Sequence, residues 1–115
     1  MTSDRLSKIV LAALEDLKAV DIRILDVKRL TSITDIMIVA SGTSDRHVRS
    51  IADKIIEAVK ARKVRPLGVE GQLQGDWILI DLGDIIIHVM RPATREYYQL
   101  EKLWSVKARR VSSTQ

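Results

Sequence analysis

Residues 77–90, WILIDLGDIIIHVM, predict a β-hairpin with Gly83 and Asp84 as its two-residue loop. Glycine adopts positive φ at no steric cost, and aspartate tolerates it better than most residues do, so both primed turns that suit hairpins are accessible. A loop this short leaves the two strands one register. The predicted pairs are Leu82 with Ile85, Ile80 with Ile87, Leu79 with His88, and Trp77 with Met90.

Side chains alternate across a strand, so the predicted hairpin has two different faces. One face is aliphatic and is the predicted core face: Ile78, Ile80, Leu82, Ile85, Ile87 and Val89. The other mixes aliphatic side chains with aromatic and polar ones: Trp77, Leu79, Asp81, Ile86, His88 and Met90. Such a mixture favours a surface that a partner covers. The alternative is a face that lies under a helix, with Asp81 and His88 satisfied by hydrogen bonds.

The composition of the chain limits the classes of protein to which it can belong. It has 115 residues, enough for one compact domain. It has no cysteine and two histidines far apart in sequence, so we expect neither a disulfide nor a zinc site. No apolar segment approaches the roughly 20 residues of a membrane-spanning helix, and no leader peptide is recognisable, so we expect a cytoplasmic protein with no membrane contact. The net charge of +4 favours contact with nucleic acid or with acidic surfaces.

Apolar residues recur at three- and four-residue steps in three segments, which we predict to be helices. Two of these helices are long, over about 3–19 and 45–62, and one is short, over about 95–105. Basic residues such as Arg46 and Arg49 fit the solvated side of the second helix. The expected N-caps are Ser3 or Asp4 for the first helix and Ser44 for the second.

Three more segments have the pattern of strands. Residues 22–28 suit a strand at or near an edge of a sheet, and residues 35–40 suit an interior strand. A short strand is predicted over 64–70, where Pro66 favours an edge or a bulge. The order of elements along the chain is therefore α-β-β-α-β-β-β-α.

This order predicts a single α/β (α+β) domain over residues 1–106, built on a mixed sheet of about five strands. The two long helices each bury one stripe and together cover one face of the sheet. The short C-terminal helix cannot cover the other face, so part of the face that carries Trp77 and His88 should remain open. Residues 107–115 are expected to form a basic, flexible tail.

Three groups of residues could be an anion, metal or catalytic site, but each is explained more simply by its role in the fold. The segment SGTSDRH (41–47) lies between a strand and a helix and would suit an anion, but it lacks the glycine spacing and the lysine of a phosphate-binding loop. Asp81, Asp84 and Asp35 would suit magnesium, although the turn alone explains Asp84. No nucleophile motif accompanies His88, which we expect to be a hydrogen-bonding surface residue. We therefore expect no catalytic residue, no metal and no cofactor.

The aromatic residues are concentrated near the C-terminus. The segment REYYQLEKLW (95–104) holds three of the four, and Trp77 is the fourth. Tyrosine and tryptophan combine a large apolar area with a polar group and are favoured at interfaces. We expect some of these rings to dock the last helix on the sheet and others to extend the open patch beside Trp77.

Four motifs occur in order between about residues 22 and 104: LDVKRLTSITDIMIVASGTSDRHVRSIADKI, EG, GDWILIDLGDIIIHVM and REYYQLEKLW. Together they resemble the ribosomal silencing factor family, RsfS, also called Iojap-like. The resemblance implies a fold similar to nucleotidyltransferases in members that look catalytically inactive. It also implies repression of translation, because members bind the large ribosomal subunit through its protein L-fourteen and block joining of the small subunit.

The resemblance further implies a homodimer when the protein is free. The net positive charge predicts in addition that basic residues outside the docking positions approach neighbouring ribosomal RNA. One departure from the family pattern is Met90, where an aromatic residue is common. The docking positions that the resemblance implies are Trp77, Leu79, Asp81, His88, Met90, Tyr97, Tyr98, Leu100, Glu101 and Trp104.

Two other functions remain open at this point. One is a nucleotidyltransferase-like enzyme that binds a nucleotide at 41–47, for which calorimetry with ATP and magnesium is the test. The other is a direct RNA-binding module that uses Arg46, Arg49 and the tail. It predicts affinity for naked RNA that falls steeply with salt.

Overall fold

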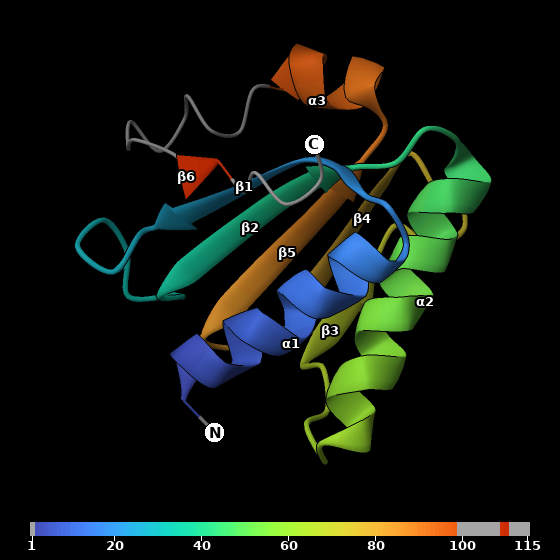
Figure 1. The fold of residues 1–115 in the computed structure, drawn as a ribbon. Coiled ribbons are helices and arrows are strands. Elements are labelled where there is room, and N and C mark those ends of the chain that lie inside the picture. Colours follow the sequence, from blue (N-terminus) through green and yellow to red (C-terminus); the bar gives the residue numbers. More distant parts are fainter. Residues whose placement is uncertain (1, 99–108, 111–115) are drawn as a thin grey trace.

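The computed structural model describes residues 2–98 and 109–110 (Figure 1). Its elements are, in chain order, α1 (Ser3–Asp16), β1 (Val20–Asp26), β2 (Ile36–Ser41), α2 (Asp45–Ala61), β3 (Gly68–Glu70), β4 (Trp77–Asp81), β5 (Ile85–Met90), α3 (Pro92–Tyr98) and β6 (Arg109–Arg110). The strands form a sheet in the order β3-β4-β5-β2-β1-β6. Strands β2 and β5 are parallel and the other neighbours are antiparallel, which confirms the predicted mixed sheet.

The hairpin predicted from residues 77–90 forms with the predicted register. At its end, the Leu82 N–H donates a hydrogen bond to the Ile85 carbonyl oxygen over 2.9 Å. Gly83 has a φ of +88°, which fits a type II′ turn with glycine at the first loop position. The predicted aliphatic face is buried throughout: Ile78, Ile80, Leu82, Ile85, Ile87 and Val89.

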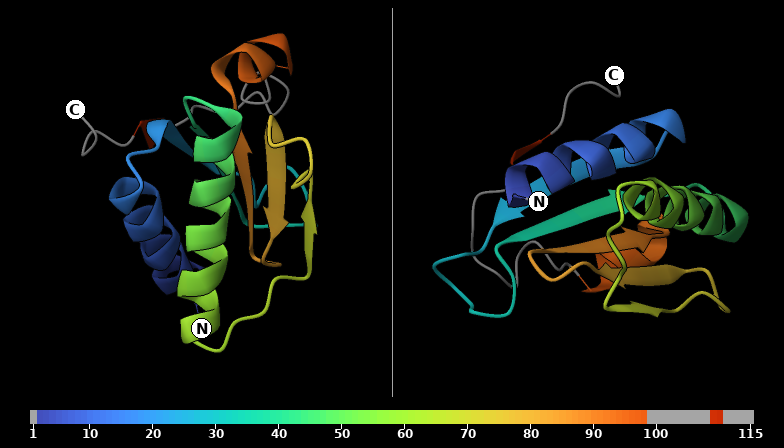
Figure 2. Two further views of the ribbon diagram at one scale, coloured as in Figure 1. Left: turned by 90° about the vertical axis from the view of Figure 1, so that its right-hand side faces the viewer. Right: turned by 90° about the horizontal axis from the view of Figure 1, so that it is seen from below.

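Helices α1 and α2 pack on each other and cover one face of the sheet (Figures 1 and 2). Between them and the sheet lies the larger apolar core, which joins the helix stripes to the aliphatic face of the hairpin. Burial of these side chains is the main stabilising contribution to the fold. The predicted arrangement of two long helices on one face is therefore confirmed. Fully buried helix residues include Val10, Leu14, Ile51 and Ile55.

The ends of α1 differ from the prediction for reasons that lie in the backbone. Thr2 is the N-cap rather than Ser3 or Asp4, because the Thr2 hydroxyl accepts a hydrogen bond from the Arg5 N–H over 3.2 Å. The helix also ends earlier than expected, since Lys18 adopts a φ of +57° and turns the chain toward β1.

The other elements agree more closely with expectation. Ser44 caps α2 as predicted, with its hydroxyl accepting from the His47 N–H over 3.0 Å. Helix α3 begins at Pro92 rather than near Arg95, because proline suits the first turn of a helix, where an N–H has no intrahelical partner. Strand β6 pairs with β1 inside the segment expected to be a tail, so the sheet has six strands where five were expected.

Candidate functional site

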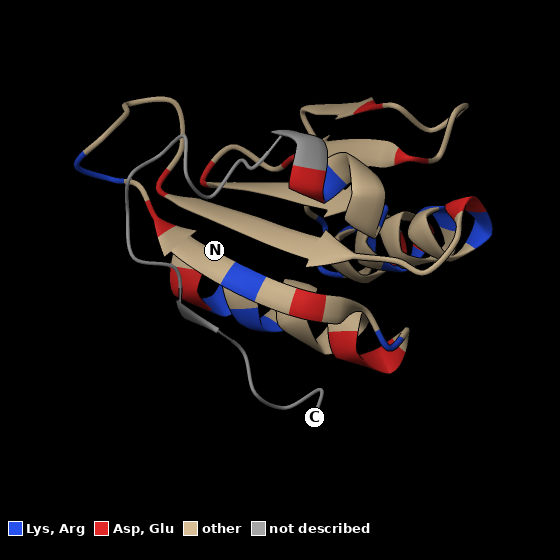
Figure 3. Ribbon diagram, turned by 90° about the horizontal axis from the view of Figure 1, so that it is seen from above, with Lys and Arg blue, Asp and Glu red and all other residues tan. Residues whose placement is uncertain are grey.

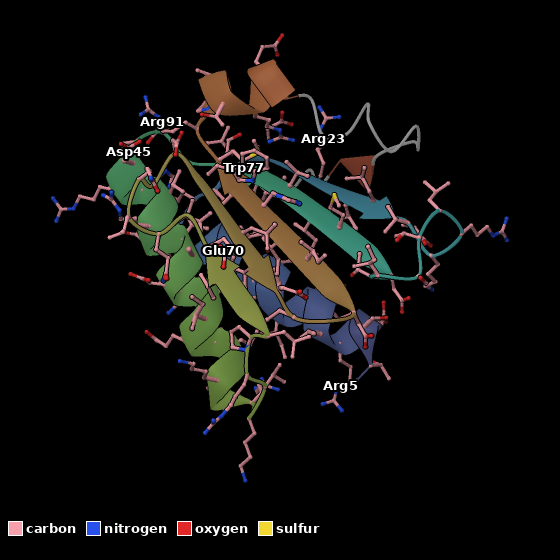
Figure 4. The ribbon with its side chains drawn as sticks, turned by 180° about the vertical axis from the view of Figure 1, so that it is seen from behind. Arg5, Arg23, Asp45, Glu70, Trp77 and Arg91 are labelled. Carbon is pink, nitrogen blue, oxygen red and sulfur yellow. The ribbon has the colours of Figure 1, made fainter. Side chains whose placement is uncertain are left out.

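The face of the sheet turned away from α1 and α2 carries the mixed side chains that the sequence indicated (Figure 4). On this face Trp77, Leu79, Asp81 and Ile86 are partly exposed. The exposed Glu70 of edge strand β3 pairs with Leu79 and therefore lies on the same face. We call these five residues the Trp77 surface.

Trp77 is held in place by His88, its diagonal neighbour on β5. The Trp77 Nε1–H donates a hydrogen bond to His88 Nδ1 over 3.0 Å, and the ring centroids lie 5.9 Å apart with the planes at 46°. Since Nδ1 accepts, the imidazole carries its proton on Nε2. Burial lowers the pKa of His88 from 6.5 to about 4, because desolvation penalises the charged form. His88 therefore orients the indole as a neutral acceptor.

The expectation of an open face is wrong for His88 and Met90, which are 6% and 0% exposed. Met90 belongs to a second, smaller apolar cluster on this side of the sheet, against which Trp77 also packs. His88 is thus a buried hydrogen-bonding residue rather than a surface one. The cause is non-local, since β2 lies beside β5 and β1 beside β2, so their apolar side chains gather next to Met90. The cluster's other members are Leu25, Val27, Met37 and Val39.

Two carboxylates give the Trp77 surface an acidic side. Asp81 also closes the hairpin, because one of its oxygens accepts a hydrogen bond from the Gly83 N–H over 2.8 Å. Glu70 was interpreted from the sequence only as a strand end. Its pairing with Leu79 depends on a long loop between β3 and β4, which gives no register by itself. Acidic groups beside apolar side chains suit a basic partner with an apolar patch.

The loop that leads into Trp77 is anchored to α2 by Arg49. The Arg49 guanidinium donates hydrogen bonds to the carbonyl oxygens of Gln72 and Leu73, over 3.0 and 2.5 Å. Gly75 lies against the same group, and a Cβ at Gly75 would stand 2.9 Å from the central guanidinium carbon. Arg49 was expected on a solvated face or in contact with RNA. It is exposed, as expected for the solvated side of α2, and its contacts also position the start of β4.

Helix α3 is docked on the sheet by the buried Arg95. Its Nη1 donates hydrogen bonds to the Asp21 carbonyl oxygen over 2.6 Å and to Ser41 Oγ over 3.0 Å, and its Nη2 lies 3.7 Å from the Asp21 carboxylate. Beside it, Arg91 pairs with Asp45 at the start of α2 over 2.9 Å. Figure 3, which views the molecule from this end, shows acidic and basic residues together in α3 and in the first turns of α2.

The remaining predicted docking residues belong to the C-terminal segment. Tyr97 and Tyr98 form the end of α3. This helix begins beside the start of β4, because the Arg91 N–H just before it bonds to the Asp76 carbonyl oxygen. The predictions on Leu100, Glu101 and Trp104 lie outside the described residues.

The strand-to-helix turn at 41–47 uses several of its N–H groups internally. The Gly42 N–H donates to the Met90 carbonyl oxygen over 3.0 Å, and the Thr43 N–H donates to His47 Nδ1 over 2.9 Å. These bonds agree with a turn rather than an anion site. Across residues 2–98 and 109–110, no group of three or more acidic, histidine or cysteine side chains is arranged to hold a metal ion. The helices in that same part of the chain are too short or too polar to cross a bilayer.

The chain is similar over its length to proteins of one family. Residues 1–115 match the family model described as ribosomal silencing factor during starvation. The ribosomal silencing factor RsfS of Chromobacterium violaceum is 44% identical over 104 residues, which cover 90% of this chain and 85% of that protein. A crystal structure of a protein from the same bacterium matches with a TM-score of 0.90 at 43% identity, covering 93% of this chain and 89% of that one. Mouse mitochondrial assembly of ribosomal large subunit protein 1 is 36% identical over 91 residues, which cover 76% of this chain and 40% of that protein.

Proposed function

Because this chain belongs to the ribosomal silencing factor family, we propose that it represses translation by binding the large ribosomal subunit and keeping the small subunit from joining. The observation that carries the proposal is the partly exposed Trp77, which a buried, neutral His88 holds on the face of the sheet turned away from α1 and α2. Oriented aromatic side chains of this kind are typical energetic centres of protein interfaces. The protein acts by occupancy, in the cytoplasm, and not as an enzyme.

The proposed partner on the large subunit is protein L-fourteen, as the resemblance implies. Proteins of that kind are basic, so the docking surface needs local negative charge in a chain whose net charge is +4. Asp81 and Glu70 supply this charge next to Trp77 and Leu79. Complementary charge of this sort steers association and fixes orientation, while the desolvated tryptophan supplies most of the affinity.

Steric blocking places a simple demand on the molecule. A rigid domain that occupies the surface where the subunits meet prevents their joining as long as it binds the large subunit more strongly than the small subunit does. The sheet provides this rigidity, because Trp77 is fixed both by His88 and by the apolar cluster around Met90. When the protein is free, we propose that a second copy covers the Trp77 surface, giving a homodimer.

Truncation of the tryptophan tests the docking proposal. Trp77→Ala should weaken cosedimentation with purified large subunits by roughly 2 kcal/mol or more, about thirtyfold, as central interface residues do. Leu30→Ala is the matched control, since Leu30 is 50% exposed in the β1–β2 loop, at the other end of the strands. The control should bind like the wild type.

A second variant separates docking from stability. The double substitution Asp81→Asn with Glu70→Gln removes both charges, while the asparagine oxygen still accepts from the Gly83 N–H that closes the hairpin. Binding of large subunits should fall and become less dependent on salt, with unfolding by urea unchanged. Unaltered cosedimentation of both the folded Trp77→Ala protein and this double variant would refute the proposed docking surface.

A further inference from the structure

One end of the molecule carries six exposed basic side chains that come from three segments. They lie in the first two turns of α1, at the end of α2 and in the connector from α2 to β3. Among the described residues, none of the six forms an ion pair. We call this group the basic end, and its members are Arg5, Lys8, Lys60, Arg62, Lys63 and Arg65.

A groove between α1 and α2 holds half of the basic end. Arg5 and Lys8 line it from α1, and Arg62 lines it from the end of α2. The acidic lining residue, Asp16, is already engaged by Lys54 over 3.4 Å. The three remaining cations therefore face the groove without a compensating carboxylate in its lining.

A second groove lies on the other side of the end of α2, toward β3. Lys60, Lys63 and Arg65 line it, together with one carboxylate, Asp53. The basic end thus extends continuously around the end of α2 from one groove to the other. Figure 4 shows Arg5 at the lower end of the molecule, where nitrogen-tipped side chains also project from α2.

We propose that the basic end binds the phosphate backbone of RNA. Exposed lysines and arginines that lack acidic partners gain most from an extended polyanion, because binding releases the counterions that condense on it. Under the proposed function the protein binds the ribosome, where RNA is the polyanion that it meets. The segments that carry the six basic residues, 5–8 and 60–65, contain no aromatic residue on which a base would stack. Binding is therefore to phosphates and independent of base sequence.

The basic end lies far from Trp77, the proposed anchor of the docking surface. The Asp81 end of that surface lies nearer, because the Leu67 N–H in the connector from α2 to β3 bonds to the Asp81 carbonyl oxygen. Arg91 ties the start of β4 to the start of α2, through its N–H to the Asp76 carbonyl oxygen and its guanidinium to Asp45. The basic end lies at the opposite end of α2, whose 17 residues span about 25 Å. The inference goes beyond the proposed function. Its choice of RNA rests on that function, but its test on the isolated chain gives a result that is distinct from the docking test.

The main test measures binding of the full chain to a short fluorescein-labelled RNA hairpin over a range of salt concentrations. The triple variant Lys60→Gln, Arg62→Gln and Arg65→Gln should weaken binding and make the slope of log affinity against log salt shallower by about three. A control triple, Lys18→Gln, Lys28→Gln and Arg29→Gln, removes the same charge from exposed positions elsewhere. The control should retain most of the wild-type slope.

A pair of single variants tests whether a loss of RNA binding could come from misfolding. Lys63 follows α2 with a φ of +62°, and Lys18 follows α1 with a φ of +57°. In both places the N–H of the lysine and the N–H of the residue after it bond back to the helix in the pattern of a Schellman motif. Glycine suits this conformation better than lysine, so Lys63→Gly and Lys18→Gly should each stabilise the fold. Lys63→Gly should nevertheless weaken RNA binding, whereas Lys18→Gly should not.

Two results would overturn the proposal. One is an equal loss of RNA affinity in both triple variants, because net charge rather than the basic end would then govern binding. The other is displacement of the RNA by poly-L-glutamate at equal charge concentration, which would indicate an acidic protein as the partner. Trp77→Ala should bind the hairpin like the wild type, so failure of the docking proposal is distinguishable from failure of this one.

Discussion

At the scale of single residues, the hydrogen bond between Trp77 and His88 is the feature that most shapes the proposed docking surface. An indole that packs on one side against the small apolar cluster and donates its N–H to a fixed acceptor has little freedom left to lose on binding. A protonated His88 would have no lone pair on Nδ1 to accept this bond. The low pKa that burial imposes on His88 therefore keeps the surface organised at neutral pH.

This arrangement predicts how stability depends on pH. The pKa of His88 is about 4 in the folded protein and near 6.5 when unfolded, so the unfolded chain binds more protons between these values. Stability is fully present above pH 6.5 and falls as the pH drops toward 4, by roughly 3 kcal/mol. Urea unfolding over this range measures it. His88→Asn offers an oxygen to the Trp77 N–H and does not titrate, so its stability should fall less over the same range. Equal pH dependence in both proteins would contradict this assignment.

At the scale of elements, Arg95 is a side chain that docks the short helix α3 on the sheet. Seven residues are too few for a helix to be stable alone in water. Arg95 supplies the missing stabilisation, since it is 7% exposed and bonds to Asp21 of β1 and Ser41 of β2. Because both partners lie at the end of the sheet near Trp77, Arg95 also determines where the end of α3, with Tyr97 and Tyr98, lies.

Loss of this anchor has a measurable consequence. Arg95→Met should lower the free energy of unfolding by about 3 kcal/mol, because the buried Ser41 hydroxyl and the partly buried Asp21 carbonyl oxygen lose a charged donor. It should also speed amide hydrogen exchange in α3 more than in α2. Arg46→Met is the control, since Arg46 is exposed in the first turn of α2 and should unfold like the wild type. Wild-type exchange in α3 of the Arg95 variant would mean that other contacts dock this helix.

At the scale of the whole molecule, two surfaces differ in chemistry, and the anchor of one, Trp77, lies toward the opposite end of α2 from the basic end. The Trp77 surface is apolar and acidic, and the basic end is cationic. The net charge of +4 is therefore distributed unevenly over the molecule. Such a molecule can bind a basic protein with one end and a polyanion with the other. It also has an exposed apolar surface that self-association would cover in the free state.

The proposed homodimer gives the prediction at this scale. Light scattering should give a mass that rises from monomer toward dimer with concentration, because association is governed by mass action. Trp77→Ala should shift the curve to higher concentration, while the control Leu30→Ala should not. A monomer at every concentration of the wild-type protein would contradict a dimer formed through this surface.

The sequence by itself determined the parts of this protein that depend on neighbours along the chain. The hairpin register follows from a two-residue loop, the helix stripes follow from a repeat of about 3.6 residues, and the Ser44 cap follows from a hydroxyl beside the first free N–H groups. The one-sided cover of the sheet followed from counting helices against strands. The resemblance to one family could also be recognised from the sequence, because each of its motifs is a continuous stretch of residues.

Only the tertiary structure decided which residues of the mixed face are open. His88 and Met90 are buried because β2 and β1 continue the sheet beyond β5, and nothing near residues 88–90 in the sequence encodes those neighbours. Glu70 joins the surface through a register set across a loop. Arg49 and the buried Arg95 bond to partners 23 to 74 residues away. Local patterns report φ, ψ and periodicity. Burial depends on contacts between segments far apart in the chain, and these exist only once the chain has folded.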